Sequence, residues 1–294
     1  MRVLITGANG FLAGHLLAYL RTRPNLEMRS LTRKECDLSR DKEKLSSELR
    51  GFQPDRVFHL AGRINGSESE LFRDNHLATR NLLETMRRLA PAARIVVGST
   101  TAVYGHGGTA AAPLSEDQTA APHGNYAESK YAAEEEALAH ACAGGWIVIA
   151  RMSNPVGSNM NTTLLCGALA QQIVEIERGK TPIVTLRDLE PKRDFISVRD
   201  CVRALWTLAE SGIPGAVYNV ASGESTAIAD IVRIFLDLAR VRPIAVRTLP
   251  SDEVRSSVRE QCVSNARLRG LGWKPEETVR QAIGNQLDAE RSRL

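Results

Sequence analysis

Two residues able to move a proton stand one helical turn apart in this chain. Tyr126 and Lys130 are separated by Ala-Glu-Ser, so they occupy positions i and i+4 and share one face of a predicted helix, Tyr126–Ala143. A free tyrosine has a pKa of about 10 and exchanges protons poorly at neutral pH, whereas a nearby ammonium stabilises the phenolate and lowers that pKa. The pair suits proton transfer to or from a reacting oxygen. An exposed pair of ordinary helical residues is the alternative interpretation.

A glycine-rich turn near the N-terminus is the second candidate site. It runs from Gly7 to Gly14, after an apolar predicted strand and at the start of a predicted helix. Gly7 tolerates backbone angles closed to other residues, and Gly10 lets the main chain approach a pyrophosphate closely. The helix N-terminus adds unpaired N–H groups and partial positive charge. An ordinary tight turn is the alternative to a dinucleotide cradle, whose members would be Gly7, Asn9, Gly10, Phe11 and Leu12.

Positive charge follows the second predicted strand, at Thr32-Arg33-Lys34. In dinucleotide-binding folds an acidic residue at this place binds a ribose 2′-hydroxyl and repels a 2′-phosphate. The two cations, Arg33 and Lys34, instead favour NADP(H) over NAD(H). A solvated basic turn that binds nothing is the alternative.

The elements that must position these residues alternate between strands and helices. Strands are predicted at Arg2–Thr6, Glu27–Thr32, Arg56–Leu60, Arg94–Gly98, Trp146–Arg151 and Ala216–Val220, and helices at Phe11–Arg23, Glu70–Leu89, Tyr126–Ala143, Thr163–Gly179, Val198–Ser211 and Ala227–Ala239. Continuous apolar runs such as Ile95 to Val97 are typical of strands buried on both faces. The alternation predicts an α/β fold, a doubly wound parallel sheet of the Rossmann type.

Composition excludes several classes of protein. The 294 residues are 43% hydrophobic and 24% charged, which is ordinary for a globular protein with a sizeable core. No apolar run approaches the ~18 residues needed to span a bilayer, and no signal peptide is expected, so a membrane partner is not predicted. The net charge of +4 is too small and dispersed to indicate nucleic-acid binding. The 5 widely spaced cysteines include no C-x-x-C pair, so we expect no metal site, no disulfides and a cytoplasmic location.

Several motifs occur in one order along the chain. They are Gly7-x-x-Gly10, Asp37-Leu38, His59-Leu60-Ala61-Gly62, Ser99 to Gly105, Tyr126-x-x-x-Lys130 and Arg151-x-x-Asn154-x-x-Gly157. Together they resemble the short-chain dehydrogenase/reductase family. One departure is Ala13, which stands where the family has the third glycine of its turn. Alanine is small, so close packing of helix on sheet should survive.

The resemblance implies roles for the matching residues. Thr100 would be the third catalytic group, holding the reacting oxygen while Tyr126 exchanges its proton and Lys130 holds the nicotinamide ribose. Hydride would pass between the substrate carbon and the nicotinamide. Further cofactor contacts would be Asp37 and Leu38 beside the adenine, Leu60, Ala61 and Gly62 beneath the cofactor, and Asn154, which would also touch the substrate.

Later segments resemble the extended branch of this family, whose members act mainly on nucleotide-activated sugars. The segments are Lys192 to Asp200, Val217 to Gly223 and Gly272-Trp273-Lys274-Pro275. Arg193 and Arg255 could then bind a diphosphate, because guanidinium groups suit phosphate oxygens; a solvated surface charge is the alternative for Arg255. Thr101 is a further candidate substrate contact. The stretches Ala168–Gly179 and Gly215–Gly223 most resemble GDP-4-keto-6-deoxy-mannose reductases.

The sequence therefore predicts NADPH-dependent reduction of a 4-keto-6-deoxy sugar linked to a nucleoside diphosphate, with GDP favoured. A 4,6-dehydratase is disfavoured, because Thr101-Ala102 stand where those relatives carry Asp-Glu and neither can transfer the extra protons. An epimerase that retains its cofactor needs no such acid pair and stays open. A catalytically inactive, NADP-binding regulatory protein is the non-enzymatic alternative.

The expected organisation has two parts. The first, 1–159 with 196–222, would bind NADP, and the second, 160–195 with 223–294, would bind the nucleotide sugar. The substrate would lie between them at the carboxyl ends of the strands. Family resemblance further implies a homodimer that pairs the helices Glu70–Leu89 and Tyr126–Ala143.

Overall fold

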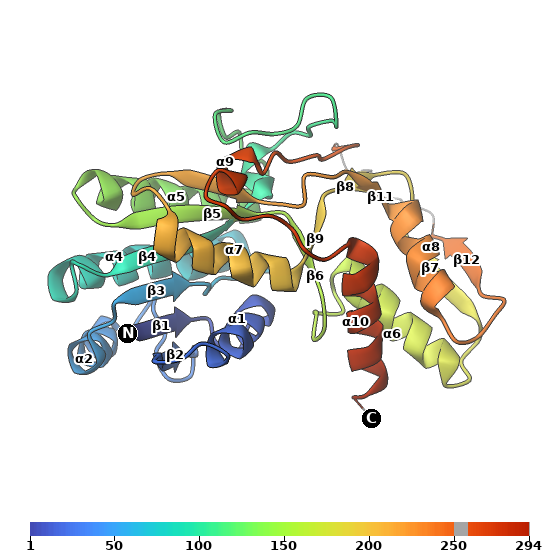
Figure 1. Cartoon of the computed structure of the whole chain (residues 1–294), viewed down its shortest axis with the longest axis horizontal. Coiled ribbons are helices and arrows are strands. Elements are labelled where there is room, and N and C mark those ends of the chain that lie inside the picture. The colour runs from blue at the N-terminus through green and yellow to red at the C-terminus, as the bar shows by residue number, and fades with distance from the viewer. Residues whose placement is uncertain (250–257, 294) are drawn as a thin grey trace.

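A six-stranded parallel sheet forms the centre of the protein, seen in a computed structural model that describes residues 1–249 and 258–293 (Figure 1). Its spatial order is β10 (Val217–Val220), β5 (Ile147–Met152), β4 (Arg94–Thr100), β3 (Arg56–His59), β1 (Arg2–Thr6) and β2 (Glu27–Leu31). Each neighbouring pair is parallel. All six strands therefore run in the same direction, and their carboxyl ends lie on one side of the sheet.

Helices cover both faces of this sheet. One face carries α1 (Phe11–Arg21) and α7 (Val198–Ser211), and the other carries α2 (Lys42–Phe52), α4 (Ala78–Leu89) and α5 (Asn125–Cys142). The interior strands have apolar centres because both their faces are buried; Val3, Val57 and Val96 have no exposed surface, whereas the edge strand β2 is partly polar and only its Leu31 is buried. The α/β, doubly wound architecture is thus as predicted. Within the described residues, none of the helices combines the length and apolarity needed to cross a bilayer.

A smaller group of elements lies beside the carboxyl ends of the strands (Figure 1). It contains β6 (Asn154–Val156), α6 (Leu165–Glu177), β7 (Ile183–Leu186), β8 (Lys192–Arg193), β9 (Phe195–Ser197), β11 (Thr226–Ala227), α8 (Ile228–Leu238), β12 (Ala245–Thr248) and α10 (Val279–Arg291); α9 (Ala266–Arg269) lies near β10. Side chains from α6, α8 and α10 share a hydrophobic cluster of their own, separate from the two clusters on the sheet. The division into two binding domains remains a prediction.

Three features differ from the predicted elements. Helices α2 and α10 were not predicted, although Leu45, Leu49 and Phe52 in α2 recur at helical spacing and are buried. Short strands in the smaller group were also missed. The segment predicted as one helix, Glu70–Leu89, is divided into α3 (Glu68–Leu71), a π-helical turn η1 (Phe72–Leu77) and α4. Hydrogen bonds of the π type occur mostly as single turns and frequently at functional sites.

Candidate active site

The glycine-rich turn connects β1 to α1 and packs against the residues that follow β3. Gly7 has a φ of 72°, and a Cβ there would lie 2.7 Å from the Cα of Ala61, so a side chain is excluded by conformation and by space. The Gly10 N–H donates to the Gly7 carbonyl over 2.8 Å, and Gly10 is the N-cap of α1. The turn therefore lies directly against Ala61 and presents the start of α1 to the space above the sheet.

A cavity of about 310 Å³ opens beside this turn, and we call it the Arg33 cavity. Predicted residues that line it are Gly7, Asn9, Gly10, Arg33, Asp37, Leu38, Leu60, Ala61 and Gly62. One oxygen of the Asp37 carboxylate, Oδ1, accepts hydrogen bonds from both the N–H and the hydroxyl of the nearby Ser39. Lys34 is exposed and is not among the described residues that line this cavity. The structure thus brings Arg33 to the predicted cofactor groove and leaves Lys34 outside it.

A second cavity, of about 470 Å³, contains the predicted catalytic group and is called the Tyr126 cavity. Thr100, at the end of β4, lines it together with Tyr126 and Lys130 of α5. Thr100 lies next to Tyr126 and acts to lower the pKa of its phenol. Phe11, Leu12 and Asn154 line this cavity too. The convergence arises because β4 ends beside the first turn of α5, so a strand end and a helix start face one space.

Lys130 does not act on Tyr126 as expected. Its ammonium donates a 2.6 Å hydrogen bond to the Gly98 carbonyl, and burial lowers the pKa of Lys130 to about 8. Burial raises the pKa of Tyr126, an effect that Thr100 opposes. The direction of the Tyr126 shift is thus opposite to the lowered pKa that its spacing from Lys130 predicts.

A buried network beneath the cavity fixes the elements that carry these groups. Glu134 of α5, with no exposed surface, accepts a hydrogen bond from the Ser99 hydroxyl of β4 and two-pronged hydrogen bonds from Arg151 of β5. The closest of the Arg151 contacts is 2.7 Å. The Arg151 guanidinium also lies 4.8 Å from the centre of the Tyr104 ring. This network therefore joins α5 to β4 and β5. Removing one partner would leave an unpaired buried charge, which strongly destabilises a folded protein.

Asn75 of η1 connects the catalytic helix to the turn after β3, and its role was not predicted. Its Nδ2 donates to the Ser129 hydroxyl over 2.9 Å, and that hydroxyl donates to the Tyr126 carbonyl. The same amide group bonds both the N–H and the carbonyl of Arg63. A Cβ on Gly62 would lie 2.9 Å from the Asn75 Oδ1, which explains the glycine before Arg63. No spacing signal marks Asn75 in the sequence.

A third cavity, of about 280 Å³, continues from the Tyr126 cavity and is called the Arg193 cavity. Both are bordered by Thr100, Ala102, Ser153 and Asn154. Thr101 and Arg193 line it as predicted, joined by His106 and His123, which the sequence reasoning missed although they lie in the long loop after Tyr104. No Asp or Glu is present among the described residues around either cavity. Arg255 lies outside the described residues.

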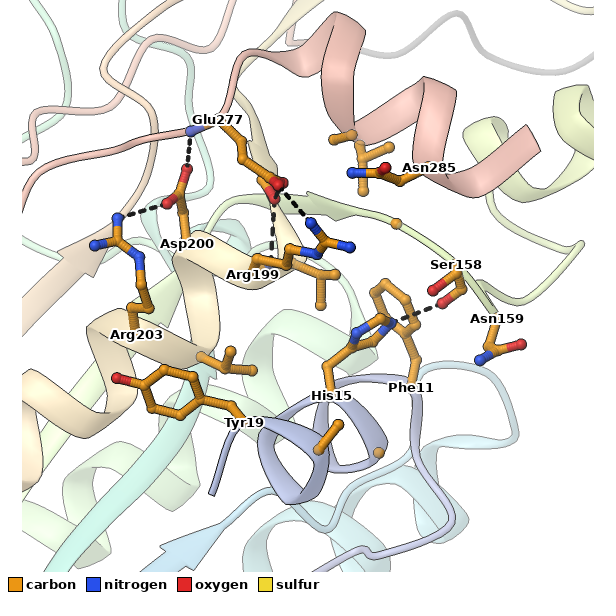
Figure 2. A pocket seen from close by; sticks show the side chains of 18 of the residues that line it. Phe11, His15, Tyr19, Ser158, Asn159, Arg199, Asp200, Arg203, Glu277 and Asn285 are labelled. Atoms are coloured by element: carbon orange, nitrogen blue, oxygen red, sulfur yellow. Dashed lines mark hydrogen bonds and ion pairs between the residues drawn. The ribbon is translucent and has the colours of Figure 1, made fainter. Parts of the chain in front are cut away.

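A fourth cavity, of about 880 Å³, is larger than these three, lies between α1, α7 and α10 and is called the His15 cavity (Figure 2). The His15 imidazole is hydrogen-bonded to the Ser158 carbonyl, and Arg199 and Arg203 form ion pairs with Glu277 and Asp200 at 2.9 and 2.6 Å. Thr100, Tyr126 and Lys130 are not among the described residues that line it. Its charges neutralise one another, so we place the candidate active site in the three cavities above.

The residues present fit a bound dinucleotide. Gly10, Leu60, Gly62 and Arg63 border both the Arg33 cavity and the Tyr126 cavity, so the two form one groove across the strand ends. The groove passes the N-cap of α1, where unpaired N–H groups and the helix dipole favour a pyrophosphate. An arginine stands at one end and the Tyr126 phenol at the other. A nicotinamide dinucleotide, with its central pyrophosphate, suits a groove that has the N-cap of α1 between these two ends.

Comparison with known proteins assigns the family. Residues 3–221 match the model of the NAD dependent epimerase/dehydratase family. The chain is 32% identical, over 303 residues, to a GDP-6-deoxy-D-mannose reductase from Pseudomonas aeruginosa, an alignment that spans 100% of this chain and 98% of the relative.

Solved structures agree with this assignment. The structure of RMD from Pseudomonas aeruginosa complexed with NADPH superposes with a TM-score of 0.91 at 30% identity and covers 100% of this chain and 99% of the other. The structure of MoeE5 in complex with UDP-glucuronic acid and NAD superposes with a TM-score of 0.84 at 27% identity, with full coverage of both chains. This chain belongs to the NAD dependent epimerase/dehydratase family, the extended branch of the short-chain dehydrogenases/reductases.

Proposed function

We propose that this enzyme reduces the 4-keto group of a GDP-linked 4-keto-6-deoxy sugar with NADPH. The observation that carries the proposal is the juxtaposition of Thr100, Tyr126 and Lys130 around the Tyr126 cavity, where the dinucleotide groove meets the Arg193 cavity. A carbonyl placed against the Thr100 and Tyr126 hydroxyls would face the nicotinamide end of the groove.

In this mechanism the protein's own residues hold the carbonyl and supply a proton. The reduced nicotinamide, when bound, supplies a hydride to the carbonyl carbon. Thr100 donates a hydrogen bond to the carbonyl oxygen, and Tyr126 gives that oxygen its proton. A tyrosine is protonated at neutral pH, so the phenol has a proton to give to the oxygen as hydride arrives. Burial raises the pKa of Tyr126 and by itself makes the phenol a weaker acid, an effect that Thr100 opposes. The Lys130 ammonium, held by the Gly98 carbonyl, would orient the nicotinamide ribose.

The preference for NADPH is supported by Arg33, which follows β2 and lines the Arg33 cavity. A guanidinium there would pair with the 2′-phosphate, which NADH lacks. The comparisons support a nicotinamide cofactor of either kind, because RMD was solved with NADPH and MoeE5 with NAD.

Reduction is favoured over dehydration by the chemistry of the cavity walls. Elimination of water needs an added acid and base, and the described residues around the Tyr126 and Arg193 cavities include no carboxyl group. The residues directly after Thr100 are Thr101 and Ala102, neither of which can transfer a proton in this way.

The sugar nucleotide would extend from Thr100 into the Arg193 cavity. Arg193 would bind the diphosphate, and Asn154 and Thr101 would hold the sugar. The name of the Pseudomonas aeruginosa relative, which is similar over its whole length, favours GDP as the nucleotide.

The proposal is tested by incubating the enzyme with NADPH and a panel of GDP-, dTDP- and UDP-linked 4-keto-6-deoxy sugars. NADPH absorbance should fall with the GDP-linked substrate, and the Tyr126→Phe variant should lose at least about 100-fold in rate, because proton donation contributes on this scale. Conversion of one sugar nucleotide into its epimer without loss of NADPH would replace the proposal with an epimerase. Binding of NADPH without turnover of any sugar would indicate an inactive, regulatory protein.

We also propose that two copies pair through α4 and α5, which pack against each other on one face of the sheet. Leu77, at the junction of η1 and α4, is 38% exposed there and would be covered in such a pair. Light scattering at micromolar concentration should give twice the chain mass of 32.2 kDa. A monomeric mass would contradict this assembly.

A further inference from the structure

We propose that Asp74 is a positioning residue for cofactor choice, which holds Arg33 and Arg63 as a joint site for the phosphate monoester at the adenosine end of the groove. The inference deepens the proposed function, since it rests on a dinucleotide lying in the Arg33 cavity. The proposed preference for NADPH was argued above from Arg33 alone, and this inference assigns roles in it to Asp74 and Arg63 as well.

Three arginines converge on the Asp74 carboxylate. Arg33 reaches Oδ2 at 2.7 Å, Arg63 reaches Oδ2 at 2.6 Å, and Arg73 reaches Oδ1 at 2.9 Å. The Asp74 side chain has no exposed surface, whereas the Arg33, Arg63 and Arg73 side chains are 51%, 31% and 30% exposed. The carboxylate is therefore the buried base of the cluster. Arg33 and Arg63 line the Arg33 cavity with it, whereas Arg73 is not among the described residues that line this cavity.

This arrangement is electrostatically strong. Burial acts to raise the pKa of Asp74, but hydrogen bonds from Arg73, Arg33 and Arg63 outweigh it and bring that pKa well below its usual range. The carboxylate is thus ionised at any working pH. Three guanidinium groups bind this carboxylate, and a second carboxylate, that of Glu70, lies 3.7 Å from Arg63, so three positive and two negative charges leave about +1. A phosphate monoester carries about −1.5 to −2 at neutral pH, so the cluster offers it net positive charge and planar donors.

Arg63 is fixed at both ends by neighbouring residues of the π-helical turn η1. Asp74 binds its guanidinium, while Asn75 bonds its backbone N–H at 2.7 Å and its carbonyl at 3.0 Å. Asp74 and Asn75 are consecutive residues of the wide turn η1, and both of their side chains bind Arg63. Arg63 also borders both the Arg33 cavity and the Tyr126 cavity. An arginine held this firmly loses little further freedom when it binds an anion.

The positioning role and a simple charge role predict opposite effects of removing the carboxylate. If Asp74 acted only as a negative charge near the phosphate, Asp74→Asn would raise the local positive charge and tighten binding. If Asp74 holds the arginines together, the same substitution lets three like charges separate, and the phosphate loses its prearranged partners. The sign of the change in affinity therefore decides between the two.

The test compares adenosine 2′,5′-bisphosphate with adenosine 5′-monophosphate by titration calorimetry on the full chain, because the two probes differ by the 2′-phosphate alone. We expect the bisphosphate to bind the unmodified protein at least about 10-fold more tightly, an effect of the size of one charge-assisted contact. Asp74→Asn should weaken bisphosphate binding by about 10-fold or more and leave monophosphate binding within about 2-fold. Unchanged or tighter bisphosphate binding would overturn the proposal.

Two further variants keep the test decisive if Asp74→Asn fails to fold. Arg63→Ala leaves Asp74 paired with two arginines, and it should weaken bisphosphate binding about 10-fold with monophosphate binding unchanged. Full retention of bisphosphate affinity in Arg63→Ala would also overturn the proposal. The matched control is Glu84→Gln, which removes another carboxylate that binds two cations, Lys42 and Arg80, outside the cavity. It should change neither affinity.

The result also separates this inference from the proposed function. Equal affinities of the unmodified protein for the two probes would contradict the NADPH preference itself. A clear preference that survives both Asp74→Asn and Arg63→Ala would contradict the role of Asp74 alone.

Discussion

Replacing Lys130 by methionine should stabilise the folded protein at neutral pH while removing its activity. Burial lowers the pKa of Lys130 from 10.5 to about 8. At 1.36 kcal/mol per pKa unit, the charged lysine destabilises the fold by about 3 kcal/mol at pH 7. Methionine removes that penalty but loses the hydrogen bond from the charged ammonium to the Gly98 carbonyl, which contributes about 2 kcal/mol. The net gain for Lys130→Met is therefore about 1 kcal/mol.

The stability difference between Lys130→Met and the unmodified protein should depend on pH. The folded protein holds the Lys130 proton less tightly than the unfolded chain, so the penalty is fully present below about pH 8 and disappears as the pH rises to about 10.5. The advantage of the variant should shrink over that range.

Urea denaturation at pH 7 and pH 10 measures the difference in unfolding free energy between Lys130→Met and the unmodified protein. The other titrating groups are the same in both proteins, so their contributions cancel in this difference. Lys42→Met is the matched control: this lysine is 54% exposed, and its replacement should change stability little at either pH. A Lys130→Met protein less stable than the original at pH 7, or a stability difference independent of pH, would refute the reasoning.

Three other predictions concern the turn, the buried network and the cofactor. Gly7→Ala should destabilise the fold by at least about 2 kcal/mol in urea denaturation, because Gly7 has a positive φ and no room for a Cβ, while Gly14→Ala, with open space at its Cβ, should be neutral or slightly stabilising. Since the Glu134 charge raises the pKa of Lys130, Glu134→Gln should move the alkaline limb of kcat/KM to lower pH; an unmoved limb in a folded variant would count against this coupling. Arg33→Asp should reverse or erase the preference for NADPH over NADH, and steady-state KM values for both cofactors would show whether it does.

Much of the fold could be predicted because burial on both faces leaves a simple mark in the sequence. The runs Val3–Ile5 and Ile95–Val97 are apolar throughout, and they are interior strands of the sheet. Helix α2 was overlooked because its composition is polar, with only a narrow apolar stripe of Leu45, Leu49 and Phe52 facing the core.

The candidate site was predictable where chemistry follows strand ends and helix starts. Thr100 and Tyr126 were expected together and do line one cavity. The clamp on Arg63 could not be foreseen, because it depends on one π-helical turn that brings Asp74 and Asn75 to a residue eleven and twelve positions earlier. Side-chain periodicity assumes regular helices, so it gives no signal for such a turn. The partner of Lys130, a backbone carbonyl, is equally invisible in a pattern of side chains.

The central claim is that this enzyme consumes NADPH stoichiometrically to reduce a 4-keto sugar nucleotide. The most direct test follows NADPH absorbance and sugar-nucleotide product together, with GDP-4-keto-6-deoxy-mannose as substrate and Tyr126→Phe as the inactive control. The account predicts one NADPH oxidised per 4-hydroxy product formed, with both signals lost in the variant. Product formation without net NADPH oxidation would contradict it, as would unchanged turnover by Tyr126→Phe.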